Sequence, residues 1–169
     1  LNRQKIRVRE YVESNLTFLE IKNKSNKGRT KKIRISVPDE NIKSHTDAVD
    51  FINKSANYGI DEISGRLRNQ FSRITLVNKG KTERLTIDIS IKFENCVTGK
   101  KNTIPALCIV EVKRDGNVYS PFTSYMADFR IKKKSISKYC LGMILTDPNL
   151  KQNRFKRKLR YIEKMLSKK

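Results

Sequence analysis

Two arginines, Arg7 and Arg9, lie two residues apart near the start of the chain, in a segment where polar and apolar residues alternate. Alternation with a period of two predicts a β-strand that carries both side chains on one face. Such side chains are about 7 Å apart in an extended strand, a separation that suits adjacent phosphate groups. Guanidinium groups are permanently charged and bind phosphate oxygens in a bidentate manner. The spacing therefore predicts a phosphate-binding strand.

The same alternation, with Arg or Lys at polar positions, recurs along the chain. The first segment covers residues 5–12, with Tyr11 on its polar face and Val12 on its apolar face, and further strands are predicted at 18–24, 32–37, 71–77, 84–93 and 109–113. Sheets with one solvated face also alternate, but ordinary solvated faces mix both signs of charge. The recurring positive charge favours a ring of anion-binding cations, completed by Lys22, Lys32, Arg34, Arg73, Arg84 and Lys113.

Carboxylates are few on these polar faces, and two of them are candidate metal ligands. Glu111 lies two residues from Lys113, on the same predicted face. A hard cation such as Mg²⁺ or Mn²⁺ takes one or two carboxylates together with phosphate oxygens and water. Glu111 is therefore the first candidate ligand and Glu20 the second. A salt bridge to a basic neighbour explains either residue equally well.

The overall charge agrees with a polyanionic ligand. Lys and Arg total 38 against 17 Asp and Glu, so the net charge of the 169 residues is +21. This excess attracts nucleic acid, anionic membranes or soluble polyphosphates. Nucleic acid is disfavoured, because we find no interleaved aromatic platform and no groove-reading helix. No apolar run approaches the about 20 residues of a membrane span.

Residues for nucleophilic catalysis are scarce. His45 is the only histidine and is expected to be exposed at a helix start. Cys96, Cys108 and Cys140 show neither zinc-site spacing nor disulfide density, which predicts packed thiols in a reducing cytoplasm. No P-loop or nucleophile elbow is present. Phosphoryl transfer by positioning and charge neutralisation with a metal remains compatible with this composition.

The strands predict an α+β fold, in which an antiparallel β-barrel-like tunnel with a basic interior is flanked by helices. Unpaired cations cannot be buried, so the tunnel must hold water, counter-ions or a multiply charged anion. Helices are predicted after Pro38, from Gly59 to Leu67 and at 124–130. A hairpin turn is predicted at 78–81, with a positive φ at Gly80. We expect one domain over residues 1–169.

Residues 150–169 are predicted to form a basic C-terminal helix. Its apolar stripe would contain Phe155, Leu159, Ile162 and either Met165 or Leu166. Packing of that stripe with a solvated basic face is the favoured interpretation. Contact with an anionic membrane or a partner is the alternative.

Several segments, in their order along the chain, resemble the VTC domain, the polyphosphate polymerase domain of the triphosphate tunnel metalloenzyme (CYTH-like) superfamily. The resemblance rests on residues 6–11, 19–22 and 32–34, on Arg73, on Arg84 with Asp88, on 110–113 and on 137–142. It implies a tunnel in which inorganic polyphosphate is made from ATP with a divalent cation, Mn²⁺ or Mg²⁺. The first strand of the family is expected upstream of Leu1.

The resemblance also implies roles for individual residues. Phosphate-binding or catalytic roles fall to Arg7, Arg9, Lys22, Lys32, Arg73, Arg84 and Lys138. Substrate contacts are expected from Tyr11, Arg34, Lys113, Lys134 and Ser137. Lys134 adjoins Ser135, where some relatives carry a further lysine. Metal binding falls to Glu111.

The leading hypothesis is a metal-dependent polyphosphate polymerase. The alternatives are a non-catalytic polyphosphate-binding module and a triphosphatase of the same superfamily. The expected ligands are ATP and inorganic polyphosphate or triphosphate. Because family members often work beside membrane proteins, a membrane protein is a further expected partner. We expect a cytoplasmic location, of which the cytoplasmic face of a membrane is one option.

Overall fold

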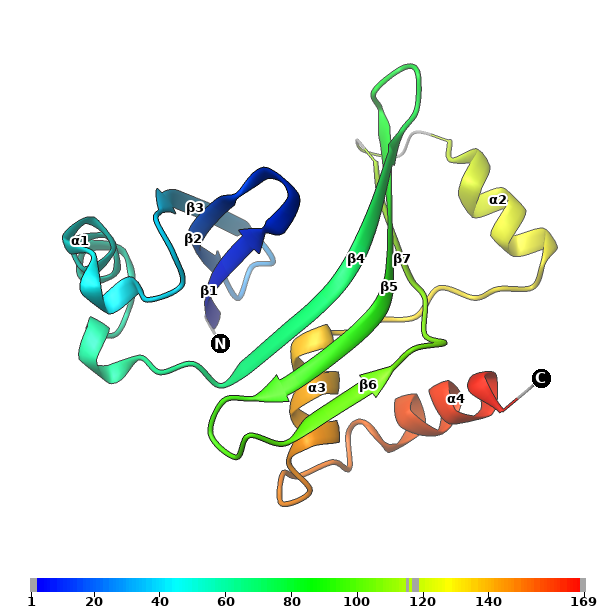
Figure 1. The fold of residues 1–169 in the computed structure, drawn as a ribbon. Coiled ribbons are helices and arrows are strands. Elements are labelled where there is room, and N and C mark those ends of the chain that lie inside the picture. Colours follow the sequence, from blue (N-terminus) through cyan, green and yellow to red (C-terminus); the bar gives the residue numbers. More distant parts are fainter. Residues whose placement is uncertain (1–2, 115, 117–118, 168–169) are drawn as a thin grey trace. The chain divides into compact units, whose positions relative to one another are not determined.

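The computed structural model describes residues 3–114, 116 and 119–167, which form two compact units that divide between Ser64 and Gly65 (Figure 1). Each unit contains an antiparallel sheet and at least one helix, which confirms the mixed α and β class. The described strands form two open sheets and no closed barrel. The tunnel and the single domain over 1–169 therefore stay predictions.

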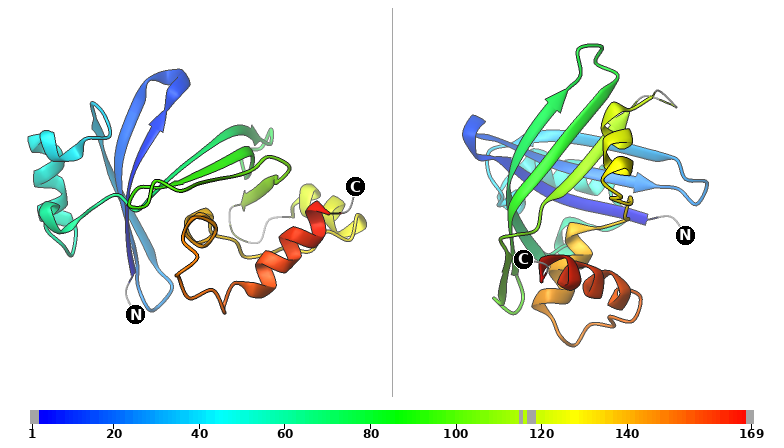
Figure 2. Two further views of the ribbon diagram at one scale, coloured as in Figure 1. Left: turned by 60° about the horizontal axis from the view of Figure 1, so that its bottom comes forward. Right: turned by 90° about the vertical axis from the view of Figure 1, so that its right-hand side faces the viewer.

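The first unit is a three-stranded sheet with a helix on one face. Strands β1 (Arg3–Tyr11), β2 (Leu16–Lys24) and β3 (Thr30–Val37) pair in the order β1-β2-β3. Helix α1 (Thr46–Ser55) lies beside this sheet (Figure 2), and Ala48 and Ile52 are fully buried in the core. The apolar positions of the strands pack there, with Ile6 opposite Ile21 and Ile21 opposite Ile33. The predicted alternation is confirmed for these three strands.

Four local predictions for the first unit are wrong. Val12 leaves the strand and lies exposed in the short 3-10 helix η1 (Val12–Ser14). The helix predicted from Gly59 is only the single turn η3 (Ile60–Glu62). After Pro38 a separate turn, η2 (Ile42–Ser44), precedes α1. His45 is half-buried rather than exposed, and its Nε2 lies 3.0 Å from Oδ1 of Asp39.

The second unit is built on the long strand β5 (Glu83–Asn95). Strand β4 (Leu67–Val77) pairs along one edge of β5, whereas β6 (Lys101–Ile104) and β7 (Ile109–Arg114) share the other edge. Helix α3 (Lys138–Thr146) packs on β4, β5 and β6. Helices α2 (Pro121–Asp128) and α4 (Lys156–Leu166) complete the unit. Its core contains Ile91, Phe93, Leu107, Leu141 and Ile162.

A β-bulge at Ser90 exchanges the faces of β5. The pairing with β4 shifts between Gln70 and Ser72, and Ser90 adopts a positive φ of 55°. An extra residue in one strand reverses the alternation beyond it. Asp88 therefore shares a face with Ile91 and Phe93, all of them buried, whereas Ile89 lies on the opposite face. The uninterrupted alternation predicted over 84–93 is wrong beyond this point.

Gly142 lets α3 approach the sheet closely. A Cβ atom at this position would lie 2.5 Å from Cδ1 of Phe93 and 2.6 Å from Cδ2 of Leu67, which is closer than atoms pack. The glycine thereby fixes the height of α3 above β4 and β5. Lys138, one turn before Gly142, is positioned through the same contact.

Other boundaries also differ from those predicted. Helix α2 begins at Pro121, behind the capping side chain of Ser120, and ends before residue 130. Helix α4 begins at Lys156 rather than at 150, but its stripe of Leu159, Ile162 and Leu166 packs in the core as predicted. In the turn after β4 the positive φ belongs to Lys81, not to Gly80.

Cys96 and Cys108 are exposed rather than packed. Within the described residues, no helix is long and apolar enough to cross a membrane.

Candidate polyanion-binding site

The face of the first sheet opposite α1 carries the predicted cations in cross-strand rows. The pairing places Lys5, Lys22 and Lys32 in one row. The next row consists of Arg7, Glu20 and Arg34, and the third of Arg9, Phe18 and Ser36. Directly opposite residues of an antiparallel pair lie on the same face. We call this surface the Glu20 face, after its central residue.

Glu20 is a buried carboxylate among these cations, and its side chain is only 2% exposed. Nε of Arg7 donates a hydrogen bond of 2.5 Å to Oε2, and Nζ of Lys32 donates to Oε1. Burial by itself raises the pKa of Glu20, but the hydrogen bonds from Lys32 and Arg7 outweigh it, so the pKa lies below its usual value. Glu20 is thus ionised and fixes two cations. Both of its oxygens are engaged, and its metal role stays a prediction.

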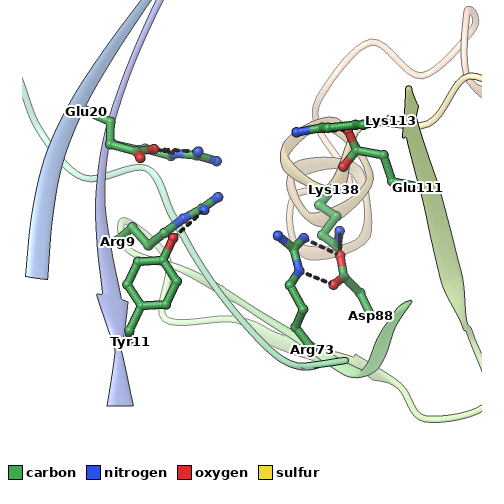
Figure 3. A network of polar contacts seen from close by, with 9 residues as sticks. Arg9, Tyr11, Glu20, Arg73, Asp88, Glu111, Lys113 and Lys138 are labelled. Atoms are coloured by element: carbon green, nitrogen blue, oxygen red, sulfur yellow. Dashed lines mark hydrogen bonds and ion pairs between the residues drawn. The ribbon is translucent and has the colours of Figure 1, made fainter. Parts of the chain in front are cut away.

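Aromatic rings support the other two arginines of this face. Cζ of Arg34 lies 4.6 Å from the ring centroid of Phe18, and Tyr11 packs edge-on against the same ring. Nη1 of Arg9 donates a hydrogen bond of 2.9 Å to the hydroxyl of Tyr11 (Figure 3). The pKa of Tyr11 is raised by burial but lowered more strongly by Arg9, and lies below its usual value. Phe18 was not among the predicted site residues, although an aromatic residue at a polar-face position is a usable signal.

In the second unit, two cations converge on Asp88, whose side chain is 1% exposed (Figure 3). Arg73 donates from Nε to Oδ1 at 2.6 Å and from Nη2 to Oδ2 at 2.8 Å. Nζ of Lys138, at the start of α3, also donates to Oδ2. Burial by itself raises the pKa of Asp88. The hydrogen bonds from Arg73 and Lys138 together outweigh this effect, so the pKa lies below its ordinary value. We call these three residues the Asp88 cluster.

Phe71 supports both cations of the Asp88 cluster. Its ring centroid lies 5.1 Å from Cζ of Arg73 and 4.6 Å from Nζ of Lys138. Phe71 also packs against the hydrophobic core of this unit, so the ring has a fixed base. Phe71 was not among the predicted site residues, although it lies two positions before Arg73 and shares the predicted polar face, as Phe18 does in the first unit.

Glu111, Lys113 and Arg84 lie on the same face of the second sheet as the Asp88 cluster. The pairing sets Arg84 opposite Lys113 and Thr86 opposite Glu111. Oε1 of Glu111 lies 3.5 Å from Nζ of Lys113, and both side chains are about half exposed. The hydroxyl of Thr86 is buried and has no hydrogen-bond partner among the described residues. A polar ligand or a water would satisfy it.

Glu111 fits a divalent cation better than the other carboxylates of these faces. Glu20 and Asp88 use both oxygens on cations, whereas Glu111 is exposed and pairs only loosely. No group of three or more His, Cys, Asp or Glu side chains capable of holding a metal occurs within the described residues. A metal here would therefore take most ligands from phosphate and water, as Mg²⁺ commonly does.

Two predicted substrate residues have structural partners elsewhere. Nζ of Lys134 lies 4.7 Å from the ring centroid of Tyr161 in α4. Oγ of Ser137 accepts a hydrogen bond of 3.4 Å from the backbone N–H of Cys140 and caps α3. Their contacts with substrate, like those of exposed Lys22, stay predictions. The complete ring of cations from both units also stays a prediction.

The family model of the VTC domain matches residues 1–146, so the chain belongs to the VTC domain family. VTC domains have the triphosphate tunnel metalloenzyme-like fold, and membership indicates a function related to polyphosphate. No curated protein and no solved structure matches the chain significantly. The match ends at the last residue of α3, so α4 lies outside it.

Proposed function

We propose that this chain is a metal-dependent polyphosphate polymerase, which transfers the terminal phosphoryl group of ATP to an inorganic polyphosphate chain. The observation that carries the proposal is the pair of cation clusters, each fixed by one buried, ionised carboxylate. Such clusters are preorganised for a ligand whose charges repeat at short intervals.

The cations of the Glu20 face and the Asp88 cluster would bind and orient the phosphates. Their hydrogen bonds to Glu20 and Asp88 hold guanidinium and ammonium groups in place before any ligand arrives. Preorganised charge costs little reorganisation when negative charge moves between phosphate oxygens. Phosphoryl transfer depends chiefly on such positioning and charge neutralisation.

Glu111 would hold the divalent cation, Mn²⁺ or Mg²⁺, with Glu20 as the second candidate. When bound, the cation would neutralise charge on the phosphoryl group in transfer. Lys113 would approach the same phosphates from the neighbouring position of β7. Tyr11, Arg34 and Ser137 would add contacts to the chain of phosphates.

A non-catalytic polyphosphate-binding module is the second candidate. It is favoured by the scarcity of metal-binding carboxylates, since the described residues contain no cluster of three or more. A triphosphatase of the same superfamily would also need such carboxylates. Product analysis separates the three activities.

The test is incubation of the purified chain with ATP and Mn²⁺, followed by gel electrophoresis and, after chelation of the metal, ³¹P NMR. The polymerase predicts polymer with an equivalent amount of ADP. Glu111→Gln should lose turnover but retain polyphosphate binding, whereas the exposed control Glu40→Gln should keep both. Orthophosphate without polymer would identify a triphosphatase. Binding without any turnover would identify the binding module.

A further inference from the structure

The outer surface of α4 is basic and lies beyond the part of the chain that matches the family. The inner face of the helix is already used, because Leu159, Ile162 and Leu166 pack in the core of the second unit. What remains outside carries Lys156, Arg157, Lys158, Arg160 and Lys164, all exposed, against one carboxylate, Glu163. An ordinary solvated helix face mixes the two signs of charge more evenly.

A second segment extends this surface. Residues 130–134 contain Arg130, Lys132, Lys133 and Lys134, all exposed, and Nζ of Lys134 packs over the ring of Tyr161 in α4. That contact holds the two stretches together. We call them the α4 basic surface, which consists of residues 130–134 and the exposed side chains of α4. The ribbon of α4 is red in Figure 1.

The cations of α4 differ in kind from those of the phosphate-binding faces. Arg7, Arg73 and Lys138 are fixed by buried carboxylates, as befits a ligand of defined geometry. Within the described residues, no cation of α4 forms an ion pair with a carboxylate. Nζ of Lys158 lies 5.5 Å from the ring centroid of Phe155, but no carboxylate fixes it. Long cations without carboxylate partners suit a partner whose negative charge is spread over an area rather than set at fixed points.

Apolar groups are exposed among these cations. Tyr161 is 43% exposed and Met165 is 42% exposed, and their spacing of four residues puts them on one side of the helix. Lys158 and Lys164, three residues before and after Tyr161, flank the same side. Tyrosine and lysine together are typical of the interface between lipid headgroups and water. A hydrated free polyphosphate offers nothing apolar for Tyr161 and Met165 to contact.

We propose that the α4 basic surface docks on an anionic lipid bilayer. The apolar stripe of α4 is committed to the core, so the helix lies on the headgroups without inserting. Attraction of several cations to anionic lipid supplies most of the binding, and Tyr161 and Met165 enter the headgroup layer. Docking of this kind weakens as salt is added.

The test uses the full chain and vesicles of phosphatidylserine with phosphatidylcholine, with binding measured by cosedimentation. The combined variant Arg157→Gln, Lys158→Gln and Lys164→Gln should weaken binding by about tenfold or more. The matched control, Lys27→Gln, Lys43→Gln and Lys79→Gln, removes the same charge from exposed positions elsewhere. It should change binding by about twofold at most. Thermal unfolding verifies that both variants remain folded.

Two results would overturn the proposal. Equal losses in the variant and the control would mean that net charge alone attracts the chain to the vesicles. Complete displacement of the chain from vesicles by short inorganic polyphosphate would mean that α4 serves the phosphate ligand instead. Binding that persists in saturating polyphosphate, and that falls when Tyr161→Ser is introduced, is the expected outcome.

Discussion

At the scale of single residues, buried carboxylates organise the cations on which the proposed chemistry depends. Glu20 and Asp88 are almost fully buried, and each binds two basic side chains that are themselves partly exposed. Each carboxylate therefore turns two flexible side chains into a fixed positive site. The ring of Phe71 also contacts both cations of the Asp88 cluster, whereas the ring of Phe18 contacts Arg34, a third cation of the Glu20 face.

Asp88→Asn should destabilise the second unit, because Arg73 and Lys138 would lose their shared negative partner. We expect a loss of about 1–3 kcal/mol in the free energy of unfolding, limited by the partial exposure of both cations. Urea denaturation measures this quantity. The control Asp50→Asn removes an exposed carboxylate on α1 and should cost about 0–1 kcal/mol. Equal stability of Asp88→Asn and the original chain would contradict the role of Asp88.

Stability should fall in acid. The pKa values of Glu20 and Asp88 are lowered in the folded chain, so both groups stabilise it above their unfolded pKa values of about 4. That stabilisation is lost as the pH falls below about 4 and through the lowered pKa values. The measurement is the free energy of unfolding across this range. Combining Glu20→Gln with Asp88→Asn should flatten the dependence, and an undiminished slope in this variant would refute the assignment.

Sequence reasoning placed these residues on the correct faces but could not assign their partners. Glu20 was open between a metal and a salt bridge, and its burial between Arg7 and Lys32 depends on the pairing of three strands. Lys138 and Asp88 are fifty residues apart, so no local pattern joins them. Thr86 gave no signal, since threonine is an ordinary strand residue by type.

At the scale of elements, the bulge at Ser90 places Asp88 and the core residue Phe93 on the same face of the second sheet. The contact at Gly142 holds α3, and with it Lys138, against that face. Without the bulge, Asp88 and Phe93 would lie on opposite sides of β5. Alternation predicted the strand but not the bulge, because a positive φ at serine is a tertiary feature. The start of α2 has a local cause, because Ser120 caps the helix and Pro121 follows at its first turn.

Gly142→Ala should loosen α3 from the sheet. Alanine is the better helix former, but the added carbon would collide with Phe93 and Leu67, and overpacking costs about 1–3 kcal/mol. We expect a lower free energy of unfolding and weaker polyphosphate binding, because Lys138 moves with the helix. Cys140→Ala, in the same helix but without an added atom, serves as control. A more stable Gly142→Ala chain would show that helix propensity outweighs the contact.

At the scale of the whole molecule, both sheets have a basic polar face. Composition predicted the positive charge, and the ordered motifs predicted the family that the match over residues 1–146 shows. Closure of the strands into a tunnel is a long-range property that alternation cannot supply. The proposed ligand is therefore best tested by its chemistry, because a phosphate chain concentrates charge more closely than a nucleic acid does.

The most direct measurement is a competition titration, in which labelled inorganic polyphosphate bound to the full chain is displaced by unlabelled polyphosphate or by single-stranded DNA with the same number of phosphates. The account predicts displacement by polyphosphate at concentrations at least about tenfold lower than by DNA, because the phosphates of polyphosphate follow one another more closely than those of DNA and more of them reach the fixed cations at once. Equal displacement by DNA would contradict the account and leave the net charge as the sole basis of binding.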